Sequence, residues 1–295
     1  MLSERQKQWG VDQWAAFLTT QTLPCMARSK MALRAFEEEE GDELSAADLS
    51  VLALGDPYLC LRLLREAESR RSHRLGHDTT TALGAVMQLG VRTFRNLLLG
   101  SPETDDQRLG LLACSARAVL ASQIARMWGR ARGDIAPDEV AMAALLAEIG
   151  ELLLWHYAPE LPEAALHLLH SGQASRSAMA QEQACGFRFR ELSLKCATVW
   201  ALPPLLIQLI RGMDNVRANL CKLYLDTARH LATAADDPAL PDDLAAAKRL
   251  IPHASLDWLA SHMNGLDEEK QARLIESAQW ILDCDNGQPE DGFSG

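Results

Sequence analysis

The sequence is poor in aromatic residues, which make up only 5% of its 295 residues. Ala and Leu are abundant instead, so strong helix formers dominate and the residues favoured in β-strands are scarce. We therefore predict an all-α fold. Hydrophobic residues make up 48% of the chain, which is enough to build one large domain or two smaller ones.

An excess of positive charge is also missing, because the formal net charge is −11. Phosphate contacts need a basic surface, so we expect neither nucleic acid nor an anionic membrane as a partner. No apolar run reaches about 18 residues without a charge, and the polar N-terminus is unlike a signal peptide. We accordingly expect no transmembrane span and a cytoplasmic location.

The seven cysteines form no Cys-x-x-Cys pair, and their number is odd. This usage is typical of reduced thiols that fill the core of a cytosolic protein, rather than of a disulfide framework.

The most apolar stretch is EVAMAALLAEIGELLLW, at residues 139–155. Pro137 precedes it and acidic residues fall in its first turn, which predicts a helix start. Apolar residues fill nearly every later position, so we predict one continuous helix buried on nearly all sides. Only Glu148 and Glu151 are charged within the stretch, and a carboxylate there needs a partner, a wet cavity or a function.

Two polar, acidic stretches at residues 100–107 and 235–243 divide the chain. We predict an N-terminal helical bundle over 1–105, a second helical bundle over 106–235, and a helical C-terminal extension with a tail over 236–295. Short helices joined by tight turns are typical of packed bundles.

Sequence landmarks follow one another in a definite order along most of the chain. They are Leu23-Pro24, Asp56-Pro57, LLREAES at 63–69, AVMQLGVRTFRNLLL at 85–99, LLACSARAVLASQIA at 111–125, AALLAEIGELLL at 143–154, ACGFRFRELSLKCATVWALP at 184–203 and LIRGMD at 209–214. In this order and spacing they resemble the HDOD domain family over residues 15–235. Glu66 and Glu68 depart from the small and amide residues usual in that family.

The resemblance implies a comparison with the HD phosphohydrolases, whose histidines and aspartates hold metal ions that activate water. The positions that would carry those ligands hold mostly other residue types here. They are Cys114, the pair Ala147-Glu148, Phe189, the pair Met213-Asp214, and Asp226. The pocket is thereby expected to be vestigial, with no catalytic residues, no metal and no cofactor.

Two other interpretations of these residues stay open. Glu148, Asp214 and Asp226 could bind Mg²⁺ or Mn²⁺ weakly through oxygen. Alternatively, Glu148 could pair with an arginine such as Arg188, or face the rim of the pocket.

Arginines gather in the sequence around the same positions. They are Arg188, Arg190, Arg211 and Arg217. Guanidinium groups in place of a metal could bind an anion such as a phosphate or a nucleotide.

Three functions follow as hypotheses. The first is a non-catalytic signalling or regulatory module that contacts signalling proteins, through a groove between the bundles or by forming a homo-oligomer. The second is a small-anion or nucleotide sensor that uses the arginines. The third is a residual metal-dependent phosphohydrolase.

Overall fold

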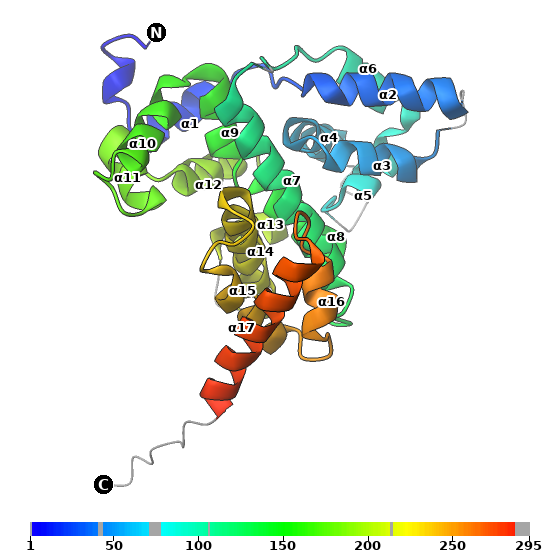
Figure 1. Cartoon of the computed structure of the whole chain (residues 1–295). Coiled ribbons are helices and arrows are strands. Elements are labelled where there is room, and N and C mark those ends of the chain that lie inside the picture. Colours follow the sequence, from blue (N-terminus) through cyan, green and yellow to red (C-terminus); the bar gives the residue numbers. More distant parts are fainter. Residues whose placement is uncertain (1, 41–43, 71–77, 106, 213–214, 287–295) are drawn as a thin grey trace, which may run out of the picture.

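The computed structural model describes residues 2–40, 44–70, 78–105, 107–212 and 215–286, and these fold into helices (Figure 1). Within these ranges no β-strand is present, and the only β-type pairing is an isolated bridge between Cys25 and Glu103. The predicted all-α fold is therefore confirmed.

The helices of the N-terminal half follow a short 3-10 turn at Gln6–Gln8. They are α1 (Val11–Leu18), α2 (Ala27–Glu40), α3 (Ala46–Leu54), α4 (Pro57–Arg70), α5 (Ala82–Leu89), α6 (Val91–Leu99) and α7 (Leu109–Gly129).

The remaining helices continue in short steps. They are α8 (Pro137–Leu146), α9 (Ile149–Tyr157), α10 (Glu160–His170), α11 (Ser177–Cys185), α12 (Phe189–Val199), α13 (Pro204–Arg211), α14 (Val216–Thr233), α15 (Leu240–Leu250), α16 (Leu256–Ser261) and α17 (Glu268–Asn286).

Asp56 connects α4 to α2 within the N-terminal bundle of α2 to α6. Its side chain is fully buried, and Oδ1 accepts hydrogen bonds from the backbone N–H groups of Tyr58 and Leu59 at 3.0 and 3.1 Å. Oδ2 accepts from Met26 N at 2.7 Å and from Ser29 Oγ at 2.8 Å. The same carboxylate thus caps α4 and ties it to the start of α2. Four donors offset the desolvation of the buried carboxylate.

The central apolar stretch is buried as predicted, but it is two helices instead of one. Residues 140–146 are all buried. Helix α8 ends at Leu146, and two residues separate it from the start of α9 at Ile149. The Gly150 N–H donates to Ser193 Oγ of α12 at 3.0 Å, where a continuous helix would have used the carbonyl of Leu146. This contact between distant segments is the physical reason for the break, and it leaves Glu148 at the start of α9.

Residues 137–157 have the length and apolarity of a membrane span, yet 78% of the most apolar part is buried inside the protein. Such burial is typical of a core helix.

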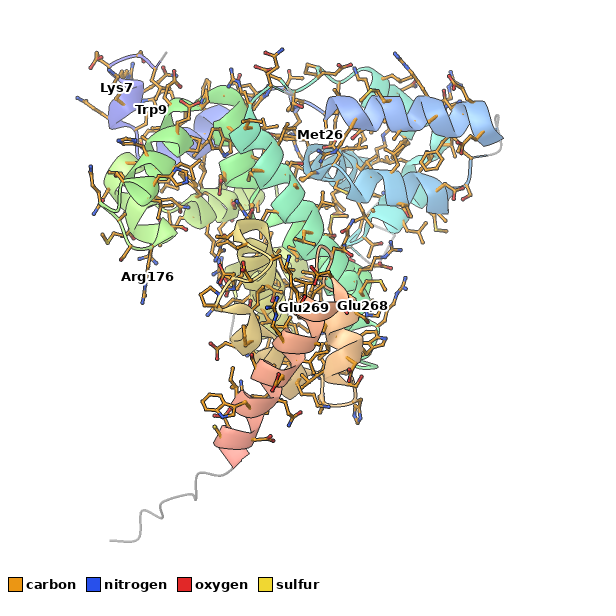
Figure 2. The ribbon with its side chains drawn as sticks, viewed as in Figure 1. Lys7, Trp9, Met26, Arg176, Glu268 and Glu269 are labelled. Carbon is orange, nitrogen blue, oxygen red and sulfur yellow. The ribbon has the colours of Figure 1, made fainter. Side chains whose placement is uncertain are left out.

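The helices form one continuous body. In Figure 1, α2 to α6 lie on one side, α1 and α10 to α12 lie on the other, and α7 to α9 run between them. The side chains of Lys7 and Trp9 mark the outer end near α1 in Figure 2. Helix α1 packs against α12, and Asp12 pairs there with Lys195 at 2.7 Å. The segment boundaries predicted at 105 and 235 stay predictions.

The C-terminal helices pack on the second bundle. Trp128 Nε1 of α7 donates to the Leu259 carbonyl at 3.0 Å, and His230 Nδ1 lies 2.7 Å from Asp243 Oδ2. Helix α17 begins at Glu268 and runs outward from the body (Figure 2).

Candidate functional site

The candidate site lies where α7 faces the start of α9. Arg117 Nε of α7 donates to Glu148 Oε2 at 2.7 Å, and Arg117 Nη2 donates to Glu151 Oε2 at 3.0 Å. Cys114 lies one turn before Arg117, and its Sγ is 3.5 Å from Arg117 Nη2 and 3.8 Å from Glu148 Oε2. One guanidinium therefore contacts two carboxylates and a thiol.

The three charged side chains are largely shielded from water. Their exposed fractions are 19% for Arg117, 12% for Glu148 and 16% for Glu151. Burial outweighs the opposing charge of Arg117 and, together with the charge of Glu151, raises the pKa of Glu148 above its ordinary value. Burial opposes the charge on Arg117, but the two carboxylates outweigh it and raise its pKa. The guanidinium is a permanent cation in this cluster.

The Cys114 thiol is fully buried. Burial, followed by the charge of Glu151, raises its pKa well above the ordinary value. A thiol in such surroundings is neither a nucleophile nor a ready metal ligand at neutral pH.

The cluster forms one wall of a cleft of about 590 Å³. Of the predicted vestigial residues, Ala147, Glu148, Phe189 and Asp226 line this cleft, and Cys114 lies behind Glu148. Met213 and Asp214 lie outside the described residues. The fold thus brings together positions from α7, the α8–α9 break, α12 and α14, as the resemblance implies.

The residues present do not suit a catalytic metal. The ligand atoms of Cys114, Glu148 and Glu151 lie within 4.8 Å of one another, a spacing that could hold a cation. The guanidinium of Arg117 already contacts all three of them. Ala147 and Phe189 offer no donor atom, and His170, which lines the cleft, does not join this cluster.

The four predicted arginines separate into two pairs. Arg188 and Arg190 line the cleft, whereas Arg211 and Arg217 are exposed and lie outside its lining. Arg188 Nε donates to Glu182 Oε1 at 2.5 Å. Glu148 does pair with an arginine, but that arginine is Arg117 and not Arg188, the example expected from the sequence.

Arg188 pairs with a carboxylate, whereas Arg190 donates to a backbone carbonyl. Arg190 donates to the Ile210 carbonyl through Nε at 3.1 Å and through Nη2 at 2.8 Å. It therefore caps the end of α13, next to the cleft.

Four residues that line the cleft were not predicted as site residues from the sequence, namely Arg117, Glu151, and Lys222 and Arg229 on α14. Arg229 pairs with Asp226 at 2.8 Å. A signal for the first two was present. Arg117 follows Cys114 by three residues and Glu151 follows Glu148 by three, so each shares a helix face with a position that the resemblance had singled out.

Comparisons with known proteins show the family and the fold. The model of the HDOD domain family matches residues 24–216, about two thirds of the chain. No curated protein matches the sequence.

The solved structures that share the fold include the following two. One is the MmoQ response regulator from Methylococcus capsulatus, with 22% identity, coverage of 87% of this chain and 99% of that chain, and a TM-score of 0.61. The other is a virulence factor from Campylobacter jejuni, with 15% identity, coverage of 90% and 99%, and a TM-score of 0.68.

Proposed function

This chain belongs to the HDOD domain family, and on that premise we propose that it is a non-catalytic regulatory module of a signalling pathway. It would act by contacting other signalling proteins, or a second copy of itself, in the cytoplasm. One of the proteins that share its fold is named a response regulator, which supports a signalling role.

The observation that carries the proposal is the position of Arg117. Its guanidinium lies within hydrogen-bond distance of Glu148 and Glu151, beside the position that corresponds to the metal ligands of the HD phosphohydrolases. A fixed positive charge repels a divalent cation and already satisfies the carboxylates. The positive charge in the cleft is therefore the guanidinium of Arg117, which stabilises the fold but, unlike a metal ion, cannot activate water.

A neutralised cluster tests this proposal. The variant Arg117→Gln/Glu148→Gln/Glu151→Gln removes every charge of the cluster together, so no buried ion is left alone. In a strain from which the gene for this protein has been deleted, this variant should reverse the phenotype that the deletion causes as well as the wild-type chain does. If the purified variant is folded but does not restore the phenotype, the cluster has a chemical role and the proposal is wrong.

The anion sensor remains the second candidate. Arg190 and Lys222 line the cleft, and neither has a carboxylate partner among the described residues. A nucleotide or phosphate that binds the folded cleft would raise the melting temperature, and Arg190→Gln should abolish that rise. The third candidate is a residual phosphohydrolase. For that activity, the Arg117 side chain would have to move away from Glu148 and Glu151 before a metal could bind there.

A further inference from the structure

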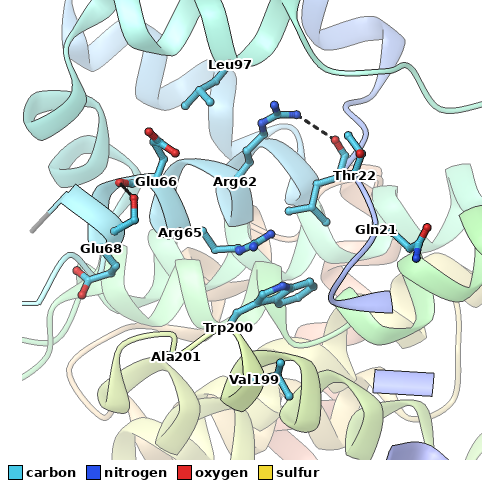
Figure 3. Close-up of a pocket in the computed structure, with 12 residues that line it drawn as sticks. Gln21, Thr22, Arg62, Arg65, Glu66, Glu68, Leu97, Val199, Trp200 and Ala201 are labelled. Carbon is cyan, nitrogen blue, oxygen red and sulfur yellow. Dashed lines mark hydrogen bonds between the residues drawn. The ribbon is translucent and has the colours of Figure 1, made fainter. Parts of the chain in front are cut away.

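A groove of about 680 Å³ lies where α4 faces the end of α12 (Figure 3). Its walls come from residues 21–23, from α4, from Leu97 of α6 and from residues 199–201. Three of the landmarks that carry the family resemblance meet here, namely Leu23, the 63–69 stretch and the Trp200-Ala201 corner. None of these residues belongs to the cleft around Arg117.

Arg65 is the central cation of the groove. Its guanidinium carbon lies 5.0 Å from the ring centroid of Trp200, and the ring is held by a hydrogen bond from Trp200 Nε1 to the Thr19 carbonyl at 3.2 Å. Within the described part of the chain, Arg65 has no carboxylate partner and donates no hydrogen bond. Stacking fixes the flat face of the guanidinium and leaves the N–H groups on its edge unused.

Arg62 adds a second cation one turn earlier on the same helix. Its Nη1 donates to the Leu23 carbonyl at 3.1 Å and to Ser101 Oγ at 2.6 Å, which leaves its Nε and Nη2 free of hydrogen bonds in the described part of the chain. Burial, and then the charge of Arg62, lower the pKa of Arg65. Two half-buried cations side by side are costly, and an anion between them would relieve that cost.

The acidic residues on the wall do not neutralise the pair. Glu66 is paired with Arg70 at 2.6 Å, and Glu68 accepts a hydrogen bond from Thr79 N at 2.8 Å. Figure 3 shows both carboxylates turned away from the guanidinium of Arg65. The positive end of the groove is therefore open to a ligand.

The backbone beside Trp200 is also unusual. Ala201 has φ of +50°, the left-handed region that costs a residue other than glycine on the order of 1 kcal/mol. Such conformations cluster at ligand sites.

We propose that this groove binds an oxyanion, a carboxylate or a phosphate, between Arg62 and Arg65. The oxyanion belongs either to a small molecule or to an acidic side chain of a protein partner. The free edge of the Arg65 guanidinium forms two parallel hydrogen bonds with the oxyanion.

Calorimetric titration of the full chain at low salt tests the site, with inorganic phosphate, succinate and a hexaglutamate peptide as probes. The wild-type chain should bind at least one probe. Arg65→Gln should weaken that binding about tenfold or more, since hydrogen bonds to charged groups are lost. Preference for phosphate or succinate indicates a small-molecule ligand, and preference for the peptide indicates a protein partner.

Three variants complete the test. Arg65→Lys keeps a cation over the Trp200 ring but lacks the fork, so it should bind several-fold more weakly with little change in melting temperature. Arg34→Gln, at an exposed position of α2, is the control and should bind as the wild type does. Arg190→Gln separates this groove from the cleft of the anion-sensor candidate, because an anion bound at Arg65 keeps its affinity in that variant.

Three results would overturn the proposal. They are no binding of any probe at about 10 mM, wild-type affinity in Arg65→Lys, and a loss of affinity in Arg190→Gln but not in Arg65→Gln. The last result would place the anion in the cleft and would support the anion-sensor function instead.

Discussion

Arg117 Nε lies 2.7 Å from Glu148 Oε2, although the two residues are 31 positions apart in the sequence. The contact joins α7 to the start of α9 at the break in the central helix. Since the guanidinium stays charged at every physiological pH, the positive charge at this position comes from the Arg117 side chain.

Removing that cation should weaken the fold. Arg117→Gln leaves Glu148 and Glu151 shielded from water without a counter-ion, and we expect a loss of about 2–4 kcal/mol in the free energy of unfolding. Urea denaturation measures it. The matched control is Arg126→Gln on the same helix, because the Arg126–Asp138 pair is more exposed, at 31% and 49%. It should cost less than about 1 kcal/mol. Equal stability of the two variants would contradict the account.

The close approach of α9 and α12 leads to a second prediction. A Cβ at Gly150 would lie 2.6 Å from Ser193 N and 2.8 Å from the Phe189 carbonyl oxygen, and both are backbone atoms that cannot move aside cheaply. Gly150→Ala should therefore lower the free energy of unfolding by about 2 kcal/mol or more. At Gly133 a Cβ meets nothing within 4 Å, so Gly133→Ala should change stability by less than about 0.5 kcal/mol. A tolerated Gly150→Ala would show that the helices are not packed as described.

The protonation of His156 should account for part of the pH dependence of the free energy of unfolding. Burial, and then the charge of Arg108, lower its pKa from the ordinary 6.5, so the unfolded chain takes up this proton at a higher pH than the folded chain. The stability that neutral His156 contributes is present above about pH 6.5 and is lost as pH falls through the lowered pKa.

Denaturation at about pH 7.5 and about pH 5.5 measures this loss. His156→Gln should lose less stability between the two values than the wild type does. His253 is exposed, so His253→Gln should lose as much as the wild type. An identical loss in His156→Gln and the wild type would mean that His156 does not titrate in this way.

Much of the fold could be predicted from local signals. Ser45 caps α3 through its Oγ, which accepts from Asp48 N at 3.2 Å, and Asp56-Pro57 opens α4, so both helix starts carry a local signal in the sequence. The break at residues 147–148 could not be predicted, because it depends on the Gly150 N–H bonding to Ser193, 43 residues away. A helix that begins at Leu240 was also missed, since the proline and the aspartates that suggested a loop lie in its first turn.

The position of the candidate site could be predicted from the sequence, but its hydrogen bonds and ion pairs could not. The order of the landmarks identified Glu148 and Cys114, which the fold does bring together. An arginine partner for Glu148, such as Arg188, was one of the alternatives from the sequence. Which arginine it is depends on the packing of α7 against α9, and the structure shows Arg117. The groove at Arg65 was expected only as a general surface between the bundles.

The most direct test of the central claim is to measure bound metal and hydrolysis on the same sample. The purified chain is incubated with Mn²⁺, its metal content is determined, and turnover of bis(p-nitrophenyl) phosphate is followed. With Arg117 paired to Glu148 and Glu151, the account predicts far less than one ion per chain and no turnover above the buffer rate. One ion per chain, together with turnover that Glu148→Gln abolishes, would contradict it.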